Sequence, residues 1–318
     1  MQCLANCRAL LAVLAFLGSG AAHAGHGIGV VGYGAESLGM AGTDIAVARD
    51  SAAVTLNPAG LTQIESGRFD VYISPFHTTR MKHSDAAGNR QLNDNSLGAP
   101  LAGSFALRLA AHPEFVLGAG FFAQGGTGMV YPDLKTPYGT RDELSAIIAI
   151  SKIVVGAGWA VNEQLSLGAN AGLFVGVARQ KFFPDTSDAG AGFFGVRMDD
   201  GFGTGANISL GLRYKMTPEL TFGLSYGSKA DLPFKNATVT VNYESLGLGR
   251  VEYRDASLAG FAVSPSLGIG LAWQARPDLL IAFEYEWLDH SSALEATRLR
   301  AKNPDGPLNY NACSTNFF

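Results

Sequence analysis

The sequence predicts an all-β protein, a transmembrane antiparallel β-barrel that carries a small N-terminal plug. Three observations lead to this fold class. An export signal opens the chain, apolar residues alternate with small or polar ones over many segments, and short polar turns separate these segments at regular intervals. The chain is 47% hydrophobic and only 16% charged, which is unusually apolar for an exported soluble protein.

Residues 1–24 have the order of a secretory signal peptide. Arg8 is the only charge, residues 9–17 form an apolar run too short to span a membrane, and residues 22–24 (AHA) form a cleavage site. We expect cleavage after Ala24 and export to the outer membrane of a Gram-negative cell. Loss of Arg8 changes the net charge from −4 to −5. This acidic balance argues against nucleic acid as a partner.

Residues 165–178 (LSLGANAGLFVGVA) illustrate the alternation of period two that predicts strands. One parity is apolar, and the other holds mostly Gly, Ser, Ala and Asn. A soluble sandwich would place Lys, Glu and Thr on its wet face. Small polar residues suit the crowded interior of a membrane barrel whose apolar face contacts lipid. A soluble β-sandwich remains the alternative fold.

Four short polar turns lie at 112–114, 162–164, 217–219 and 276–278, between 50 and 59 residues apart. Each interval holds two strands and one long loop, which is the pattern of outer-membrane barrels with short turns on the periplasmic side. Trp159, Tyr214 and Trp273 each stand three residues before a short turn, on the apolar parity. We expect them to form an aromatic girdle at one membrane interface.

We expect nine strands and a possible tenth after Leu294, whereas bacterial barrels have an even strand number. Residues 237–253 are expected to form a small hairpin within a long loop. The expected strands are 68–80, 99–110, 115–123, 147–161, 165–182, 203–216, 220–228, 258–275 and 279–291.

The segment between the signal peptide and the first strand is rich in small residues and does not alternate. Asp50 and Ser51 precede Ala52 in a pattern that caps a short helix, and Pro58 after Asn57 indicates a turn. This segment is expected to fold as a compact plug inside the barrel lumen.

At this point the chain resembles a known family, the FadL/TodX outer-membrane transporters. Residues 39–42 (GMAG), followed by Ala46, Asp50, Ser51 and residues 57–61 (NPAGL), look like the hatch signature of that family. Residues 121–131 (FFAQGGTGMVY) look like its strand that leads into a long extracellular loop. The resemblance implies a signal peptide (1–24), a hatch (25–66) and a barrel (67–318). The family norm is 14 strands, of which about ten are visible here.

The resemblance implies transport of long-chain fatty acids or other hydrophobic small molecules. In the family, ligands are captured near the outer loops, pass to a pocket closed by the hatch and leave laterally through a gap in the wall. Each CH₂ group buried in such a pocket contributes about 0.8 kcal/mol. We expect no enzyme activity, no cofactor and no metal. The expected partners are the hydrophobic ligand and outer-membrane lipid, and the chain is expected to be a monomer.

The expected ligand-binding and gating residues fall into two groups. For residues 57–59 a plain turn between plug and strand is the alternative, and for the loop-borne apolar residues it is lipid contact or loop packing. The hatch group is Gly39, Met40, Gly42, Asp50, Asn57, Pro58 and Ala59, and the apolar group is Phe121, Phe122, Met129, Val130, Tyr131, Leu144, Ile147 and Ile148.

The C-terminal tail departs from the family pattern. After Asp289 about four strands of that pattern are missing, and residues 302–318 alternate poorly. We expect either a truncated or frameshifted member of the family or a smaller barrel. A structural or adhesive barrel without transport activity is the alternative function.

Two motifs suggest enzymes, but their context argues against both. Gly27, Gly29 and Gly32 fit G-x-G-x-x-G, but after signal cleavage no strand precedes them, as a dinucleotide site requires. Ser225 stands at the centre of G-x-S-x-G, but mid-strand rather than on a strand-to-helix turn. The histidines are scattered, and none forms H-x-x-x-H.

Overall fold

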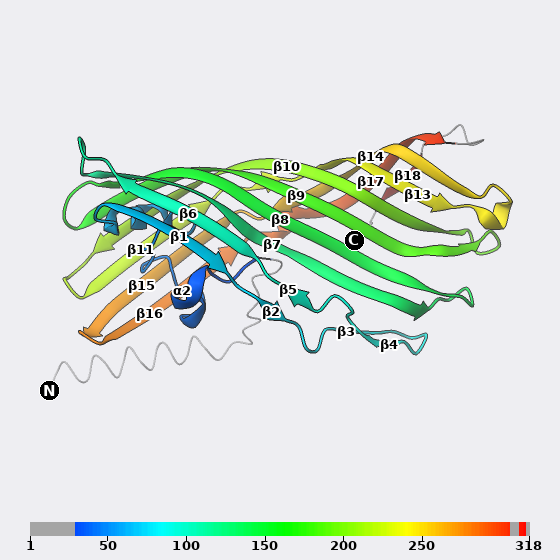
Figure 1. The fold of residues 1–318 in the computed structure, drawn as a ribbon, viewed down its shortest axis with the longest axis horizontal. Coiled ribbons are helices and arrows are strands. Elements are labelled where there is room, and N and C mark those ends of the chain that lie inside the picture. Colours follow the sequence, from blue (N-terminus) through cyan, green and yellow to red (C-terminus); the bar gives the residue numbers. More distant parts are fainter. Residues whose placement is uncertain (1–28, 306–311, 316–318) are drawn as a thin grey trace.

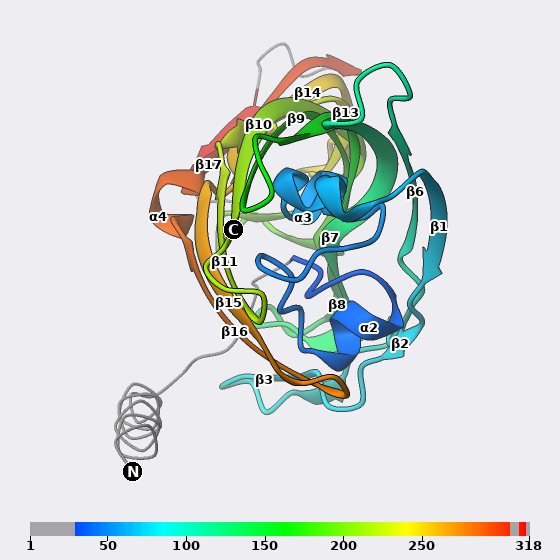
Figure 2. The same cartoon turned by 90° about the vertical axis from the view of Figure 1, so that its left-hand side faces the viewer.

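A computed structural model describes residues 29–305 and 312–315 of the chain, so the expected signal peptide lies outside the described residues. A large antiparallel sheet curls into an elongated wall, and the N-terminal segment lies within it (Figures 1 and 2). No helix of the described part is long and apolar enough to span a membrane.

The wall follows chain order from β1 to β10, and short connections join its strands from β6 onward. Its strands are β1 (Gly67–Ile73), β6 (Leu101–Arg108), β7 (Phe115–Lys135), β8 (Arg141–Ala160), β9 (Leu165–Asp188) and β10 (Phe193–Lys215). Between β1 and β6 the chain makes two small hairpin sheets from β2 (Phe76–His77), β3 (Lys82–Ser84), β4 (Arg90–Leu92) and β5 (Leu97–Gly98).

Beyond β10 the wall is built of interrupted strands. β11 pairs with the C-terminal half of β10 and is followed in the sheet by β15. β13 pairs with the N-terminal half of β10 and is followed by β14. The elements are β11 (Leu220–Gly227), β12 (Ala230–Asp231), β13 (Phe234–Asn242), η2 (Glu244–Leu246), β14 (Arg250–Val263), β15 (Ser266–Arg276), β16 (Leu279–Leu288), α4 (His290–Ala293), β17 (Leu294–Asp305) and β18 (Ala312–Thr315).

The strand predictions hold best near the short turns. The structure extends β7, β8, β9 and β10 by 6 to 12 residues at their other ends. Residues 237–253 do form a hairpin, but the expectation that it belongs to a loop is wrong, because β13 and β14 pair within the main sheet. The expected tenth strand is β17, which continues the line of β16 after α4 and pairs with β14.

The two faces of the sheet differ as the alternation predicts. Outward residues such as Ile153, Val177 and Ile281 are each 48% exposed, and the girdle residues Trp159, Tyr214 and Trp273 are 40 to 44% exposed. Phe115 stacks on Trp159 with ring centroids 5.9 Å apart. Within the described residues β1 pairs only with β6 and β16 only with β15, so the wall is open between these two strands.

Candidate functional site

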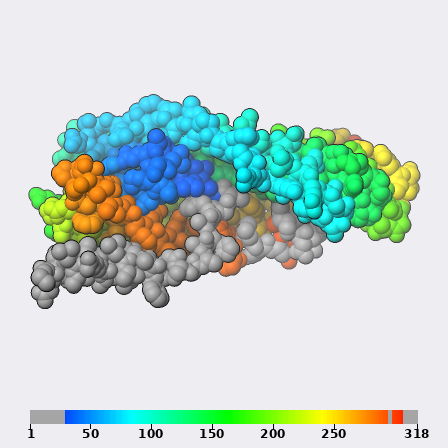
Figure 3. Space-filling view, turned by 90° about the horizontal axis from the view of Figure 1, so that it is seen from below, coloured from blue at the N-terminus to red at the C-terminus, as the bar shows by residue number. Residues whose placement is uncertain are grey.

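The N-terminal segment, residues 29–66, packs against the inner face of the wall. It contains the helix α2 (Gly34–Gly39), the short helix α3 (Ala53–Leu56) and the 3₁₀ helix η1 (Pro58–Gln63). Figure 2 shows α2 and α3 enclosed by the strands, and Figure 3 shows the same blue segment between the cyan strands and the orange β15 and β16. Asp50 accepts a hydrogen bond from the N–H of Ala52 at 3.0 Å in the turn before α3. The prediction that Asp50 and Ser51 cap this helix is wrong, because its N-cap is Ala52, which has no side-chain cap.

Side chains of the wall and of the segment tie the two together. The N–H and hydroxyl groups of Ser51 donate to Asp70 of β1 at 3.0 and 2.6 Å. At the end of η1, Arg108 of β6 donates to the carbonyls of Thr62 and Ile64 at 2.7 and 2.9 Å. These contacts hold both ends of residues 51–64.

Further hydrogen bonds fix the middle of the segment. Asn170 of β9 donates to the carbonyl of Val54 at 2.6 Å, and Ser225 of β11 donates to the carbonyl of Leu56 at 3.2 Å. The Ser225 hydroxyl therefore holds the segment from the middle of β11. A hydrolase nucleophile would instead lie on a turn between a strand and a helix.

Glycines on the inner face of the wall allow the segment to pack closely against it. Gly158, Gly168 and Gly211 are neighbours across β8, β9 and β10. A Cβ atom at these positions would lie 2.9 Å from Pro58 O, 2.6 Å from Pro58 O and 2.9 Å from Pro58 Cδ, respectively. Ordinary contact begins at about 3.4 Å, so only glycine admits η1 here without a shift.

Asn57 lies fully buried between η1 and β10. Its amide donates to the carbonyls of Ile45 at 2.6 Å and Leu212 at 3.2 Å, and its Oδ1 accepts the N–H of Ala59 at 3.1 Å. Pro58 begins η1, where a missing N–H is harmless, and Ala59 is completely buried. The turn that residues 57–59 form thus also locks the segment to the wall.

The other signature residues have unequal structural roles. Gly42 has φ = +77°, and a Cβ atom there would lie 3.0 Å from Val31 C and overlap the Val31 carbonyl oxygen. Gly39 has no atom within 4 Å of its would-be Cβ. Met40 is half-buried and packs against the small cluster that includes Ala46 and Val47.

A cavity of about 720 Å³ lies inside the wall, beside the N-terminal segment. Tyr33, Ile45 and Leu56 of the segment line one side, and Ile150 and Phe174 of the wall line another. A large cluster of buried apolar side chains, among which are Phe174, Phe234 and Phe261, occupies the lumen beyond it. The cavity therefore lies between the segment and this cluster.

Lys152 of β8 is the exceptional residue of this cavity. Its side chain is 3% exposed, and its Nζ lies 5.4 Å from the centroid of the Phe174 ring. None of the carboxylates in the described residues forms an ion pair with it. Burying an unpaired ammonium group costs several kcal/mol, so this site is electrostatically prepared for an anion.

The amide of Asn207 lies next to Lys152. A Cβ atom on Gly172 would lie 2.6 Å from Asn207 Oδ1 and 3.3 Å from Lys152 Cδ, so both side chains fill the space above this glycine. Asn207 Oδ1 is buried and has no hydrogen-bond partner within the described part of the chain, and Asn207 also lines the cavity. Lys152 therefore offers hydrogen-bond donors to a ligand, whereas Asn207 Oδ1 offers an acceptor.

The opposite side of the cavity is acidic. Glu284 of β16 accepts the N–H groups of Asp44 and Ile45, both at 2.8 Å, and so tethers the segment to an edge strand of the wall. Asp44 is buried, and the hydroxyl of Ser37 donates to it at 2.5 Å. Burial raises the pKa of Asp44 to about 6, although the hydrogen bond from Ser37 lowers it and nearby Asp50 raises it further.

The loop predicted between the strands 115–123 and 147–161 is shorter in the structure, so Met129, Val130, Tyr131 and Leu144 also lie on strands. β7 and β8 run through residues 121–148, and only residues 136–140 connect them. The predicted strand 115–123 ends too early, and Gly125 and Gly126 just beyond that end accompany a register shift within β7 rather than its end. Gly29 forms an isolated bridge to Gly125, so the segment touches the wall at this irregularity.

The structure brings only part of the apolar group to the cavity. Met129 and Ile148 line it, and Phe122 packs edge-on against Tyr33 at 4.8 Å. Phe121 is 43% exposed on the outer face, and Tyr131 is buried with its ring 5.3 Å from that of His83. The remaining members are half-buried outside the cavity lining: Val130, Leu144 and Ile147.

Sequence reasoning missed Lys152, Phe174, Asn207 and Glu284. A signal for Lys152 does exist, because it is a cation on the inward parity of an otherwise apolar strand. Among the described residues no group of three His, Cys, Asp or Glu side chains is placed to hold a metal ion.

Comparisons with known proteins agree with this architecture. Residues 15–303 match the model of the family described as outer membrane protein transport protein (OMPP1/FadL/TodX). The chain matches no curated protein sequence.

Three solved structures illustrate the likeness. The toluene transporter TbuX of Ralstonia pickettii has a TM-score of 0.72 and 22% identity over 90% of this chain and 78% of its own. The toluene transporter TodX of P. putida has a TM-score of 0.72 and 20% identity over 88% and 76%. A FadL homologue of Pseudomonas aeruginosa has a TM-score of 0.63 and 13% identity over 91% and 76%. These matches confirm the predicted fold class.

Proposed function

The chain belongs to the OMPP1/FadL/TodX family of outer-membrane transport proteins, and we propose that it carries long-chain fatty acids or similar hydrophobic small molecules across the outer membrane. Members of this family are transporters rather than enzymes. One observation carries the proposal: a largely apolar cavity contains a buried ammonium group that has no anionic partner among the described residues.

The size and lining of the cavity suit such a cargo. Its volume of about 720 Å³ falls within the range of 300–1,000 Å³ typical of small-molecule sites. An acyl chain gains about 0.8 kcal/mol for each CH₂ group transferred from water to apolar surroundings. The carboxylate of a fatty acid would meet the ammonium group of Lys152, whereas a hydrocarbon would leave this group unpaired.

The N-terminal segment is proposed to act as the hatch of this cavity. It lines the cavity with Tyr33, Ile45 and Leu56, and it is tied to the wall by Asn57 and Glu284. Release of cargo then requires some of these contacts to open. The irregularity of β7 at Gly125 adjoins the cavity, which supports a lateral route through the wall.

Uptake of two cargoes with the same tail tests the proposal. A host strain lacking its own fatty acid transporter is supplied with the full chain and with radiolabelled oleate or methyl oleate. Lys152→Met should lower oleate uptake at least tenfold, because the head group loses its cation, and should leave methyl oleate uptake unchanged. Lys181→Met is the matched control, since Lys181 is paired with Glu143 at 2.9 Å and does not line the cavity.

Two results would overturn the proposal. Equal loss of oleate and methyl oleate uptake in Lys152→Met would remove the head-group role of Lys152. Uptake of neither cargo by the unaltered protein, relative to the empty strain, would favour the alternative of a structural or adhesive barrel.

A further inference from the structure

The outer face of the wall changes character along the line of β16 and β17. The outward side chains of β16 are apolar, and Phe283, Tyr285 and Trp287 are 45 to 58% exposed. Past α4, the outward residues of β17 are Arg298 and Arg300, followed by Lys302, and all three are exposed. The alternate residues Leu299 and Ala301 are buried in the lumen cluster, which fixes the outward direction of the cations. We call Arg298, Arg300 and Lys302 the cationic stripe.

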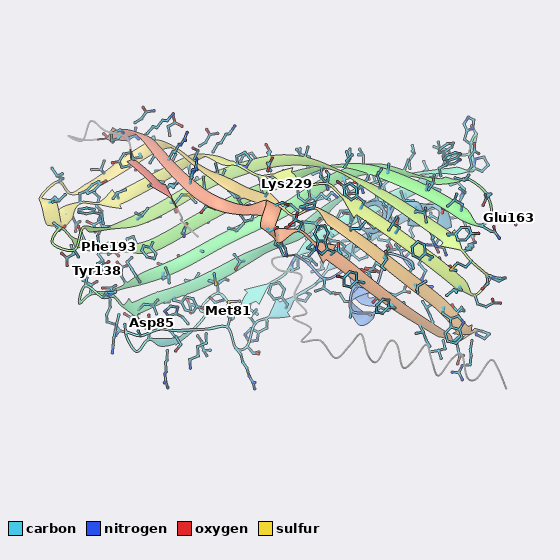
Figure 4. The ribbon with its side chains drawn as sticks, turned by 180° about the vertical axis from the view of Figure 1, so that it is seen from behind. Met81, Asp85, Tyr138, Glu163, Phe193 and Lys229 are labelled. Carbon is cyan, nitrogen blue, oxygen red and sulfur yellow. The ribbon has the colours of Figure 1, made fainter. Side chains whose placement is uncertain are left out.

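The stripe lies in the half of the molecule away from the short turns. Figure 4 places Glu163, in a short turn, at one end, and Tyr138 and Phe193 at the other. β17 and β14 run in that second half, and side chains with nitrogen tips project from the outer surface over them (Figure 4). Short turns face the periplasm in outer-membrane barrels, so the stripe lies in the half of the wall that faces the cell exterior.

The neighbours of the stripe leave its two arginines uncompensated. Across the ladder to β14, Arg298 faces Ala259 and Arg300 faces Ser257, and only Lys302 faces an acid, Asp255. Within the described residues neither arginine forms an ion pair. The nearby Arg254 differs, because it is paired with Glu252 at 3.0 Å and with Asp305 at 2.8 Å. A protein of net charge −4 therefore gathers free positive charge at one place on its outer wall.

We propose that the cationic stripe binds phosphorylated lipid head groups of the outer leaflet. The stripe continues the outward face of β16, whose last aromatic residues, Tyr285 and Trp287, are 58% and 53% exposed. Tyr and Trp are enriched at membrane interfaces. Cations placed just beyond the hydrocarbon region attract anionic lipids, and the planar fork of arginine matches the oxygens of a phosphate. Alternate residues of one strand present three such donors along one line. This site is separate from the cavity and independent of the proposed transport function.

Retention of lipid A by the purified full chain tests the proposal. The protein is folded in neutral detergent, mixed with lipid A and repurified, and bound lipid A is measured as phosphate per protein. The triple variant R298Q/R300Q/K302Q should retain at least tenfold less lipid A than the unaltered chain, and retention by the unaltered chain should fall with added salt. Dephosphorylated lipid A should not be retained, and free inorganic phosphate should not displace bound lipid A at equal concentration.

A matched triple variant controls for net charge. R80Q/K82Q/R90Q removes the same residue types from the exposed segment around β3 and β4, which lies on another side of the molecule from β17 (Figure 2). It should retain lipid A normally. Equal retention by both triple variants, or binding of dephosphorylated lipid A, would overturn the proposal.

If the first triple variant fails to fold, R298K/R300K decides the question. This variant conserves charge and loses only the bidentate geometry, so weaker retention of lipid A with unchanged folding supports the stripe. Unchanged retention contradicts a phosphate site built on arginine. Oleate uptake should be normal in every stripe variant, which keeps this test separate from that of the cavity.

Discussion

Gly168→Ala is the sharpest test of how the N-terminal segment is seated. Gly168 lies on β9 between Gly158 and Gly211, directly beneath η1. An added methyl group would lie 2.6 Å from Pro58 O and closer still to Ala59 N, whereas ordinary contact begins at about 3.4 Å. Both obstacles are backbone atoms, so no side-chain rotation relieves the overlap. The segment must therefore retreat by about 1 Å.

The structure sets the size of the effect. Overpacking of this kind costs about 1–3 kcal/mol. A retreat of η1 also lengthens the 3.2 Å hydrogen bond from Asn57 to the carbonyl of Leu212. If the cost falls on the seated state of the segment, the open fraction rises by about 5- to 150-fold. The wall itself should remain intact, since the clash lies between the wall and the segment.

Hydrogen exchange measured by mass spectrometry on the folded protein reads this out. Amides of residues 53–63 should exchange faster in Gly168→Ala by that factor, while amides of β9 and β10 stay protected. Gly103→Ala on β6 is the wall control, because its nearest atom would be 3.9 Å away. Gly39→Ala is the control within the segment, with open space around it. Equal exchange in Gly168→Ala and Gly103→Ala would refute the close approach of η1 to the wall.

Three further predictions concern the segment and the membrane face. Asn57→Ala leaves the carbonyls of Ile45 and Leu212 and the N–H of Ala59 without their partner, at about 1–3 kcal/mol for each group left unsatisfied, and exchange should accelerate at residues 45 and 59. Burial raises the pKa of Asp44 to about 6 from an ordinary value near 3.8. The free energy of unfolding therefore falls as the pH rises from about 4 to about 6, by at most about 3 kcal/mol. The unfolding temperature of the unaltered chain should fall between pH 4 and pH 7 by more than that of Asp44→Asn. The same fall in both proteins would contradict the burial of the Asp44 carboxyl group. Trp159 and Trp273 should be quenched by lipids brominated near the interface and protected from aqueous iodide, and the reverse pattern would place them outside the membrane.

The sequence predicts the half of the wall next to the short turns better than the other half. There one face of each strand meets lipid and the other meets the segment, so β9 and β15 alternate cleanly. Toward the other end the inward residues include large apolar groups such as Phe234 and Tyr253, and the outward residues include charges such as Arg254. In this half the inward face is apolar and the outward face is charged, which reverses the pattern near the short turns. A strand prediction based on one apolar parity therefore ends these strands too early.

Some residues of the candidate site can likewise be predicted from the sequence, and others cannot. Asn57 caps η1, Pro58 begins it and Gly42 has a positive φ. Each of these roles depends on the residue type and its immediate neighbours, so it can be predicted from a short stretch of sequence. The proximity of Lys152 and Asn207 depends on β8, β9 and β10 lying side by side, because both side chains lie over Gly172 of β9. Their sequence separation hides this arrangement until the register of three strands is known. The segment can therefore be recognised from its own residues, whereas the chemistry of the cavity beside it emerges only from the sheet.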